Sequence, residues 1–524
     1  MENKMKAVNK VALNTGILYG RMLLTMGISL YSTRLVLNAL GNTDFGIFNL
    51  IAGIIAMLSF LNSAMSISTQ RFLSYYQGQN NIEKQKIVFT NSLILHLIIG
   101  LVVIIGLEMC GLFLFDGVLN IPVDRIQSAT KIYHFMSLTV FFTIINVPFT
   151  GSLIAHENML WVALVSILET LLKLGIAVLL LVINQDKLVV YGILTASVSI
   201  FSFLLYAFYC KKKYEECTFN NLFVIDKKLF KELSSFAGWN LFGSICGVTK
   251  DQGFAVLINV FLGATINAAY GIANQVSSQL TFFSATMLRA LNPQIMKSEG
   301  AGDRHRMLRL SMMASKFGFF LLAFVAIPCV FEMEAILKFW LKTVPDYTET
   351  FCSLILISAL VNQLTIGLQS AFQATGKVKI YQIVVGTIVL SNIPISYTLL
   401  HLKFPVYYPL FTFAIVELFA CCFRIYLLNR VAELSIKEFF NRVIVKEIIP
   451  VLVISLSCFL VTHIIHNDLR FLFTIVISSL AFALSIFFTG LCNDEKEMIT
   501  KIAAKIKDKI GGKKNLQTTI VHNN

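Results

Sequence analysis

The sequence predicts an all-α polytopic membrane protein with about fourteen transmembrane helices. Hydrophobic residues make up 56% of its 524 residues and charged residues only 14%, whereas soluble domains carry roughly 25% charged residues; the mean hydropathy is +0.74. The alternating pattern of membrane β-strands is absent. Apolar stretches long enough to cross about 30 Å of hydrocarbon as helices are centred near residues 23, 58, 101, 141, 170, 198, 249, 282, 323, 362, 390, 416, 455 and 480.

The first apolar segment, from about Val11 to Leu37, predicts an uncleaved first span. It is too long for a signal-peptide core and has no small-residue cleavage site. The ten cysteines are scattered, mostly inside predicted spans, with no CxxC pair and no Cys/His cluster. We interpret them as small packing residues and expect neither a metal site nor a cofactor.

The net charge of +14 follows membrane topology rather than nucleic-acid binding. With the N-terminus placed inside, 30 of the 43 Lys and Arg residues fall in inside segments, 7 in outside loops and 6 within spans. This asymmetry obeys the positive-inside rule and predicts that both termini are cytoplasmic. The tail is interpreted either as a solvated charged segment or as a basic amphipathic helix that contacts membrane lipids through Ile499, Ile502, Ile506 and Ile510.

A long inside segment near the middle of the chain suggests two halves. Within it, the amphipathic run "DKKLFKELSSF" predicts an interfacial helix. Sliding the sequence by 222 residues aligns three glycine pairs, which are Gly16/Gly238, Gly41/Gly263 and Gly78/Gly300. Both copies would start inside, so we predict a parallel repeat. The expected organisation is a six-helix bundle over 1–209, a cytoplasmic amphipathic linker over 210–236, a second six-helix bundle over 237–430, two further helices over 431–492 and a basic cytoplasmic tail over 493–524.

Four stretches carry a family resemblance. They are "STRLVLNALGNTDFGIFNLIAGIIAMLSFLNSAMSISTQRFLSYYQGQ", "FAGWNLFG", "LGATINAAYGIANQV" and "LNPQIMKS". They resemble the lipid-linked oligosaccharide flippases that move O-antigen or capsular repeat units, in the superfamily that also holds multidrug and toxin extrusion transporters and the lipid II flippase. The resemblance implies two pseudo-symmetric bundles forming a V around a central cavity in the bacterial inner membrane. It also implies alternating-access transport of a polyprenyl-pyrophosphate-linked glycan.

Polar residues recur at helical spacing along several predicted spans, which indicates faces turned toward a wet cavity. The substrate-binding residues we predict there are Arg21, Lys250, Arg289, Asp251, Asn14, Asn240 and Asn274. Cations near the bilayer centre pair or face water rather than lipid. Arginine and lysine supply charge-assisted hydrogen bonds to a pyrophosphate, so the three cations are the candidates for that group.

Three acidic residues inside spans invite separate interpretations. Asp251 either neutralises Lys250 until a phosphate displaces it, or forms a permanent packing contact with it, although adjacent helical residues point about 100° apart. Glu169 is expected to pair with Lys173, four residues further on. Glu417 has no opposite charge within four residues and is the candidate for coupling to H⁺ or Na⁺.

Three functional classes remain open. Flipping of a lipid-linked oligosaccharide is preferred because cations outnumber acids among the predicted cavity residues. A cation-coupled multidrug exporter would instead line its cavity with acids and aromatics. A membrane enzyme of polysaccharide assembly would need a sizeable outside loop with catalytic residues, and the longest predicted outside loop covers only about Glu334 to Thr348. No phosphate-binding glycine loop is present, so ATP hydrolysis is not expected, and no pattern specifies an oligomeric state.

Overall fold

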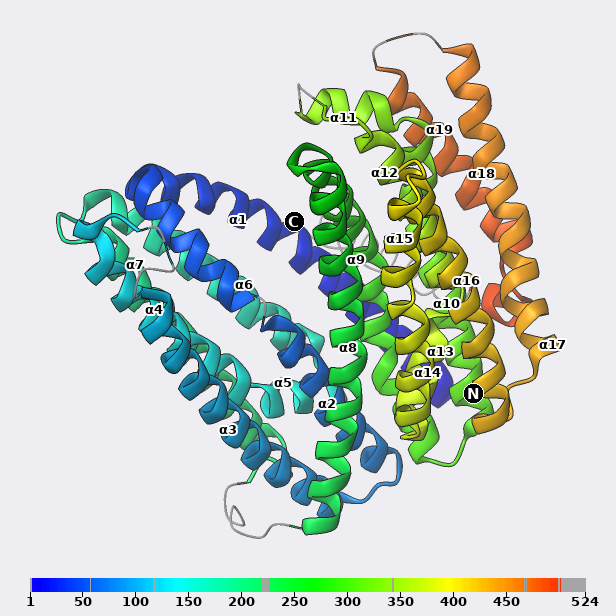
Figure 1. Ribbon diagram of the computed structural model, residues 1–524. Coiled ribbons are helices and arrows are strands. Elements are labelled where there is room, and N and C mark those ends of the chain that lie inside the picture. Colours follow the sequence, from blue (N-terminus) through cyan, green and yellow to red (C-terminus); the bar gives the residue numbers. More distant parts are fainter. Residues whose placement is uncertain are drawn as a thin grey trace, which may run out of the picture.

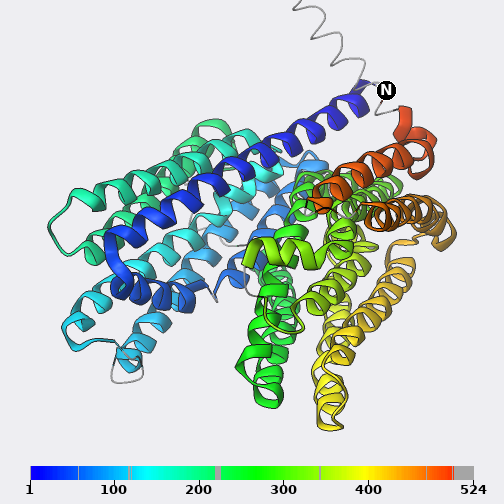
Figure 2. The same cartoon turned by 90° about the horizontal axis from the view of Figure 1, so that it is seen from above.

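A computed structural model describes residues 2–497 and 500, apart from 57, 116–118, 120, 219–225, 342–343, 466 and 468, and over these residues the fold is helical with no β-strand (Figure 1). The predicted apolar face of the tail, formed by Ile499, Ile502, Ile506 and Ile510, lies outside the described residues. The helices gather into two bundles with a further pair at one side, which Figure 2 shows from above. The predicted all-helical membrane fold with two bundles is therefore confirmed.

The first bundle contains seven α-helices. Within it α1 packs on α6, α4 on α7 and α2 on α5. These helices are α1 (Glu2–Ala56), α2 (Ser59–Gly78), α3 (Ile82–Phe113), α4 (Ile126–Ile145), α5 (Val147–Ala155), α6 (Met159–Val182) and α7 (Lys187–Lys213), with a short 3₁₀ turn η2 (Val123–Arg125) before α4.

The second bundle repeats this packing, since α8 packs on α14, α12 on α16 and α9 on α13. Its helices are α8 (Lys227–Leu262), α9 (Ala264–Gly300), α10 (Arg304–Phe331), α11 (Met333–Leu341), α12 (Thr348–Gln363), α13 (Ile366–Thr375), α14 (Val378–Leu390), α15 (Asn392–His401) and α16 (Tyr407–Ala432). The chain continues through α17 (Ile436–Phe439), η3 (Phe440–Ile444), α18 (Val445–Ile464), α19 (Arg470–Ser485) and η4 (Ile486–Gly490). Helices α18 and α19 pack against α10, and the buried Lys316 of α10 pairs with Glu495 at 2.5 Å.

Eleven helical segments of the described chain are long and apolar enough to cross a membrane, or twelve when the pair α12 and α13, bent by 43°, is taken as one span. This establishes a multi-pass membrane protein, while the exact number of fourteen stays a prediction. Helix α9, which covers the predicted eighth span, is missing from the eleven. It carries many polar residues and contacts α1 and α2 of the first bundle as well as α8, α10 and α12 of the second.

The glycines aligned by the internal repeat occupy equivalent places. Gly41 breaks α1 with φ 75° and ψ 174°, and Gly263 separates α8 from α9 with φ 86° and ψ 177°. This left-handed backbone region is open to glycine without a steric penalty, which explains the residue type at both positions. The same irregular geometry therefore ends the first helix of each bundle.

Gly78 and Gly300 show the repeat in another way, because they let α2 and α9 touch where each helix ends. A Cβ atom at Gly300 would lie 2.0 Å from the backbone oxygen of Tyr75, and one at Gly78 would lie 2.2 Å from the backbone oxygen of Lys297. Only glycine fits such a backbone-to-backbone approach. Equivalent residues of the two halves thus meet near one point between the bundles.

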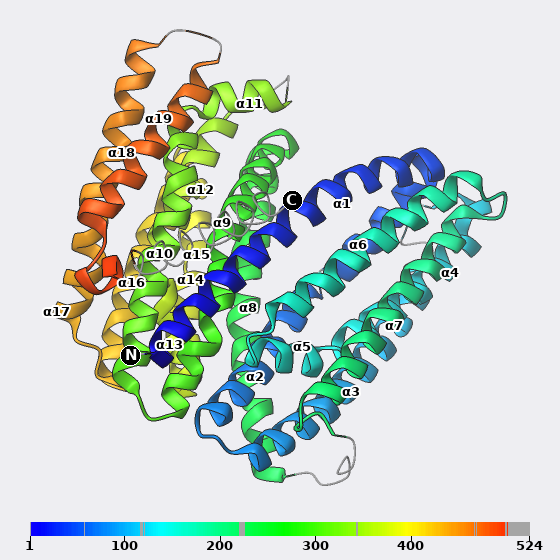
Figure 3. The ribbon, with the colours of Figure 1, turned by 180° about the vertical axis from the view of Figure 1, so that it is seen from behind.

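The bundles meet at one end of the molecule and diverge toward the other, as Figure 3 shows from behind. We call the closed end the linker end, because α7 ends there at Lys213 and α8 begins there at Lys227. The run expected to form a separate interfacial helix is instead the first part of α8. Its apolar residues Leu229, Leu233 and Phe236 enter the core formed with α2 and α3, so the helix has no reason to lie free on the membrane.

Candidate functional site

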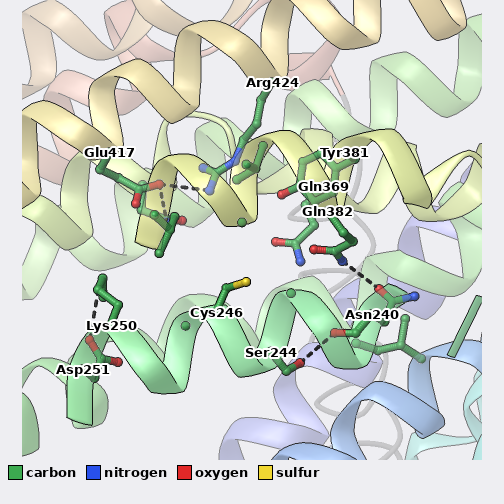
Figure 4. A pocket seen from close by; sticks show the side chains of 17 residues that line it. Asn240, Ser244, Cys246, Lys250, Asp251, Gln369, Tyr381, Gln382, Glu417 and Arg424 are labelled. Atoms are coloured by element: carbon green, nitrogen blue, oxygen red, sulfur yellow. Dashed lines mark hydrogen bonds and ion pairs between the residues drawn. The ribbon is translucent and has the colours of Figure 1, made fainter. Parts of the chain in front are cut away.

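A polar pocket of about 310 Å³ lies inside the second bundle (Figure 4). Helix α8 forms one wall, and residues of α12, α13, α14 and α16 form the opposite side. Three of the predicted site residues line it together, which are Asn240, Lys250 and Asp251, and so does the predicted coupling residue Glu417. The face of the seventh span predicted from helical periodicity is therefore the face that lines this pocket.

Lys250 and Asp251 form an ion pair, with 3.0 Å between Lys250 Nζ and Asp251 Oδ1. The two side chains bend toward each other although they start from adjacent positions on α8. Lys250 also lies over the ring of Phe413, with its Nζ 5.0 Å from the ring centroid, which is a cation–π distance. The charge of Lys250 is thus balanced within the second bundle.

Glu417 is paired as well, with a cation that lies more than four residues away along the same helix. Arg424 lies seven residues further along α16, so both side chains leave the same face of the helix. Arg424 Nη2 is 2.9 Å from Glu417 Oε1, and Asn362 donates to the same oxygen at 2.7 Å. Arg424 Nη1 also donates to Thr365 at 3.1 Å. Sequence reasoning missed Arg424 because it considered only partners within four residues.

Amide side chains also line the pocket. Gln382 donates from Nε2 to Asn240 Oδ1 at 3.1 Å, and Asn240 donates to the backbone oxygen of Phe236 at 2.8 Å. Gln369 lines the pocket without a hydrogen bond to any described residue. Gly247 leaves open space beside α8, since a Cβ atom there would meet no atom within 4 Å.

Arg21 and Arg289 lie apart from this pocket, where the two bundles meet. Helix α1 of the first bundle contacts α9 of the second, and the Tyr19 hydroxyl donates to the backbone oxygen of Phe283 at 2.7 Å. The two guanidinium groups are close enough for their positive charges to interact. Arg289 is exposed, and the half-buried Arg21 has a buried Nε without a hydrogen-bond partner among the described residues.

One acidic residue lies near Arg21. Glu169 of α6 is near enough to Arg21 to interact electrostatically with it. Its expected ion pair with Lys173 is not formed among the described residues, and the Lys173 side chain is exposed. Arg21 is therefore partly balanced by Glu169, whereas the charge that acts on Arg289 is the positive charge of Arg21.

Asn14 and Asn274 do not line the polar pocket. Asn14 is buried and donates from Nδ2 to the backbone oxygen of Glu157 at 3.0 Å, so it holds the loop between α5 and α6 instead of facing open space. Asn274 interacts with the hydroxyl of Tyr270, which in turn donates to the backbone oxygen of Asp251 at 3.4 Å. Both asparagines support neighbouring segments in this conformation.

Contacts between the bundles close the linker end. Glu157 reaches from the first bundle into the second, where Lys297 Nζ lies 2.6 Å from its Oε1 and Gln294 donates to its Oε2 at 2.8 Å. Arg71 of α2 donates to the backbone oxygens of Gln373 and Ala374 at the end of α13, each at 3.2 Å. These bonds must break for the linker end to open. Sequence analysis missed Glu157 because it lies in a short loop.

The described residues contain no group of three or more His, Cys, Asp and Glu side chains that could hold a metal ion.

Comparison with known protein families shows to which family the chain belongs. The family model for polysaccharide biosynthesis proteins matches residues 11–299, more than half of the chain. The chain belongs to the polysaccharide biosynthesis protein family. A second model, MatE, matches residues 254–398 of this polysaccharide biosynthesis protein. No curated protein matches the sequence.

Solved structures show the same fold. An outward-facing multidrug resistance MATE family transporter of the MOP superfamily has a TM-score of 0.66 at 15% identity, covering 81% of this chain and 95% of its own. A MOP superfamily transporter from Pyrococcus furiosus, described as having a binding pocket of reverse polarity, has a TM-score of 0.67 at 14% identity, with coverage of 81% and 96%. The MATE transporter ClbM in complex with Rb⁺ has a TM-score of 0.65 at 14% identity, with coverage of 83% and 96%. This family member therefore shares the fold of these three transporters.

Proposed function

We propose that the protein moves polyprenyl-pyrophosphate-linked oligosaccharide repeat units across the bacterial inner membrane by alternating access. The family and the fold support transport in polysaccharide biosynthesis. On this proposal the protein is not an enzyme, because translocation forms and breaks no covalent bond of the substrate. The partners are the lipid-linked glycan and the surrounding membrane lipids, with no role for nucleic acid.

The observation that carries the proposal is the pair of arginines between the bundles. Arg289 lies within the reach of the positive charge of Arg21, and like charges repel each other. An anion placed between Arg21 and Arg289 removes this cost and accepts charge-assisted hydrogen bonds from both guanidinium groups. A pyrophosphate has the charge and the number of oxygens for such bonds. Lys250 is a weaker candidate for the same role, because Asp251 already balances it.

The arrangement of the bundles suits alternating access. The linker end carries the basic segments that predict a cytoplasmic position, so the conformation seen here is outward-facing on this proposal. Both termini would then be cytoplasmic. Glu157 and Arg71 would hold the cytoplasmic gate closed, and their bonds to α9 and α13 would open when substrate enters from the cytoplasm.

A cation-coupled multidrug exporter is the second candidate, and the likeness to MATE structures favours it. The polar pocket argues against it, because a cationic drug needs an acid that is free to bind it. Asp251 and Glu417 are each paired with a cation instead. Coupling to H⁺ or Na⁺ remains part of the proposal, with Glu417 as the candidate residue when Arg424 releases it.

Removing the protein from cells that make a surface polysaccharide is expected to leave lipid-linked oligosaccharide in the inner leaflet. Substrate that is not translocated cannot reach later steps on the outer side, so the pool should grow while surface polysaccharide falls. The pool is measured by extraction and mass spectrometry, and its restoration by the wild-type gene is the control. Unchanged polysaccharide together with new sensitivity to cationic drugs would instead support export.

A further inference from the structure

The pocket in the second bundle has a chemistry different from that of the arginine pair. Its charged residues form two complete ion pairs, Lys250 with Asp251 and Arg424 with Glu417. Its formal charge is therefore balanced. Four amide side chains also line the pocket, with Asn240 on α8 and Asn362, Gln369 and Gln382 on the opposite side. Figure 4 shows the labelled Gln382 and Asn240 facing each other across the pocket.

A balanced pocket of this kind selects against charged ligands. A pyrophosphate entering it would approach the carboxylates of Asp251 and Glu417, and a cationic ligand would approach Lys250 and Arg424. Either would have to break an ion pair, and the Arg424–Glu417 pair is buried, so leaving one member unpaired is costly. A neutral polar ligand meets no such penalty.

Sugar hydroxyls match the hydrogen-bonding groups present. A hydroxyl both donates and accepts, and an amide side chain offers two donors and one acceptor oxygen. Gln369 brings an amide with no other hydrogen bond among the described residues, and the ion pairs offer charge-assisted bonds that are stronger than neutral ones. The volume of about 310 Å³ is at the small end of the roughly 300–1,000 Å³ range of ligand pockets, which suits part of an oligosaccharide.

We propose that this pocket is a glycan subsite, which holds sugar residues of the lipid-linked substrate while Arg21 and Arg289 hold its pyrophosphate. The inference rests on the proposed function and assigns its two chemical parts to two places. Helix α8 lines the glycan subsite and also contacts α2 and α9 at the meeting of the bundles. Occupation of the pocket by sugar therefore acts on a helix of the second bundle that also contacts the first bundle.

Filling the pocket tests the subsite without touching the arginines. Gly247→Leu adds a side chain into open space, because a Cβ there meets no atom within 4 Å. Gly238→Leu is the matched control, since Gly238 lies on the same helix, also has open space around it and does not line the pocket. Gln369→Ala is a second variant that removes an amide on which no described residue depends.

Two probes are compared by measuring Kd for the full-length protein in nanodiscs. One is polyprenyl diphosphate without sugar, and the other is the lipid-linked oligosaccharide fraction extracted from cells that make the protein. Gly247→Leu and Gln369→Ala are expected to weaken binding of the glycan-bearing probe by roughly tenfold, the effect of losing one or two net hydrogen bonds. Both variants should bind the sugar-free probe like the wild type, and Gly238→Leu should bind both probes normally.

The outcomes separate the two proposals. Suppose that the wild type binds both probes and that each pocket variant binds the glycan-bearing probe with the wild-type Kd. The subsite is then disproved while the proposed function stands. Equal weakening of both probes by Gly247→Leu would also overturn the subsite, because it would show a shared binding place. If the wild type binds neither probe, the proposed function fails and the subsite fails with it.

Discussion

Arg21→Ala is expected to abolish transport of the pyrophosphate-linked glycan while leaving the protein inserted and folded. The substitution removes one of the two cations that face the substrate anion, and a hydrogen bond to a charged group contributes about 1.5–3 kcal/mol, or at least roughly tenfold in binding. No described residue takes a hydrogen bond from the buried Nε of Arg21. Arg21→Lys should be partly active, because lysine keeps the charge but loses the two-pronged geometry.

Transport, expression and melting temperature should be measured together for these variants. Arg34→Ala is the matched control, since Arg34 is an exposed arginine on the same helix α1. The Arg34→Ala protein should transport normally. Glu169→Gln removes the acid near Arg21. This variant should retain transport if Arg21 acts by binding the substrate anion rather than by pairing with Glu169. An Arg21→Ala protein with normal stability and normal transport would disprove the assignment. A loss of yield and thermal stability would show a structural role instead.

Arg424→Ala is expected to cause the largest loss of stability. It leaves Glu417 buried without its positive partner, and breaking a buried ion pair in this way costs about 3–5 kcal/mol. It also removes the bond that Arg424 donates to Thr365. The melting temperature in detergent should fall by several degrees. The double substitution Arg424→Met and Glu417→Gln should recover most of that loss, because no unpaired charge remains buried.

Arg430→Ala is the control for this experiment. Arg430 is an exposed arginine in the last turn of the same helix α16, and exposed substitutions of this kind usually change stability by less than about 0.5 kcal/mol. A wild-type melting temperature for Arg424→Ala would contradict the ion pair. Loss of ion-driven transport in the double variant, with its stability recovered, would support a role of the Glu417–Arg424 pair in coupling.

Composition, helical periodicity and the internal repeat made much of the fold predictable. Composition and apolar length identified a helical membrane protein, and the 222-residue shift found Gly41 with Gly263 and Gly78 with Gly300. These glycines were detectable because backbone geometry and close helix contact restrict the residue type. The polar face of α8 followed from helical periodicity, which correctly placed Asn240 and Asp251 on one pocket wall.

Contacts between segments distant in the chain were not predictable in the same way. The face of α1 that holds Arg21 was found, but periodicity could not show that Asn14 on that face would bond to Glu157 in a loop of the same bundle. Glu157 itself has a left-handed backbone with φ 57°, which no simple sequence signal indicates for a glutamate. Helix α9 was predicted as a span, and its contacts with α1 and α2 of the other bundle are revealed only by the assembled fold.

The central claim is tested most directly by translocation in proteoliposomes made with purified protein and extracted lipid-linked oligosaccharide. A membrane-impermeant oxidant added outside modifies only sugars in the outer leaflet. Oxidation of oligosaccharide that began in the inner leaflet therefore reports flipping. The wild type is expected to expose the whole pool, under an H⁺ or Na⁺ gradient if one is required, and an Arg21→Ala, Arg289→Ala double variant should leave the inner pool protected. The account would be contradicted if the inner pool stayed protected with the wild type under every gradient while the same vesicles transported a cationic dye.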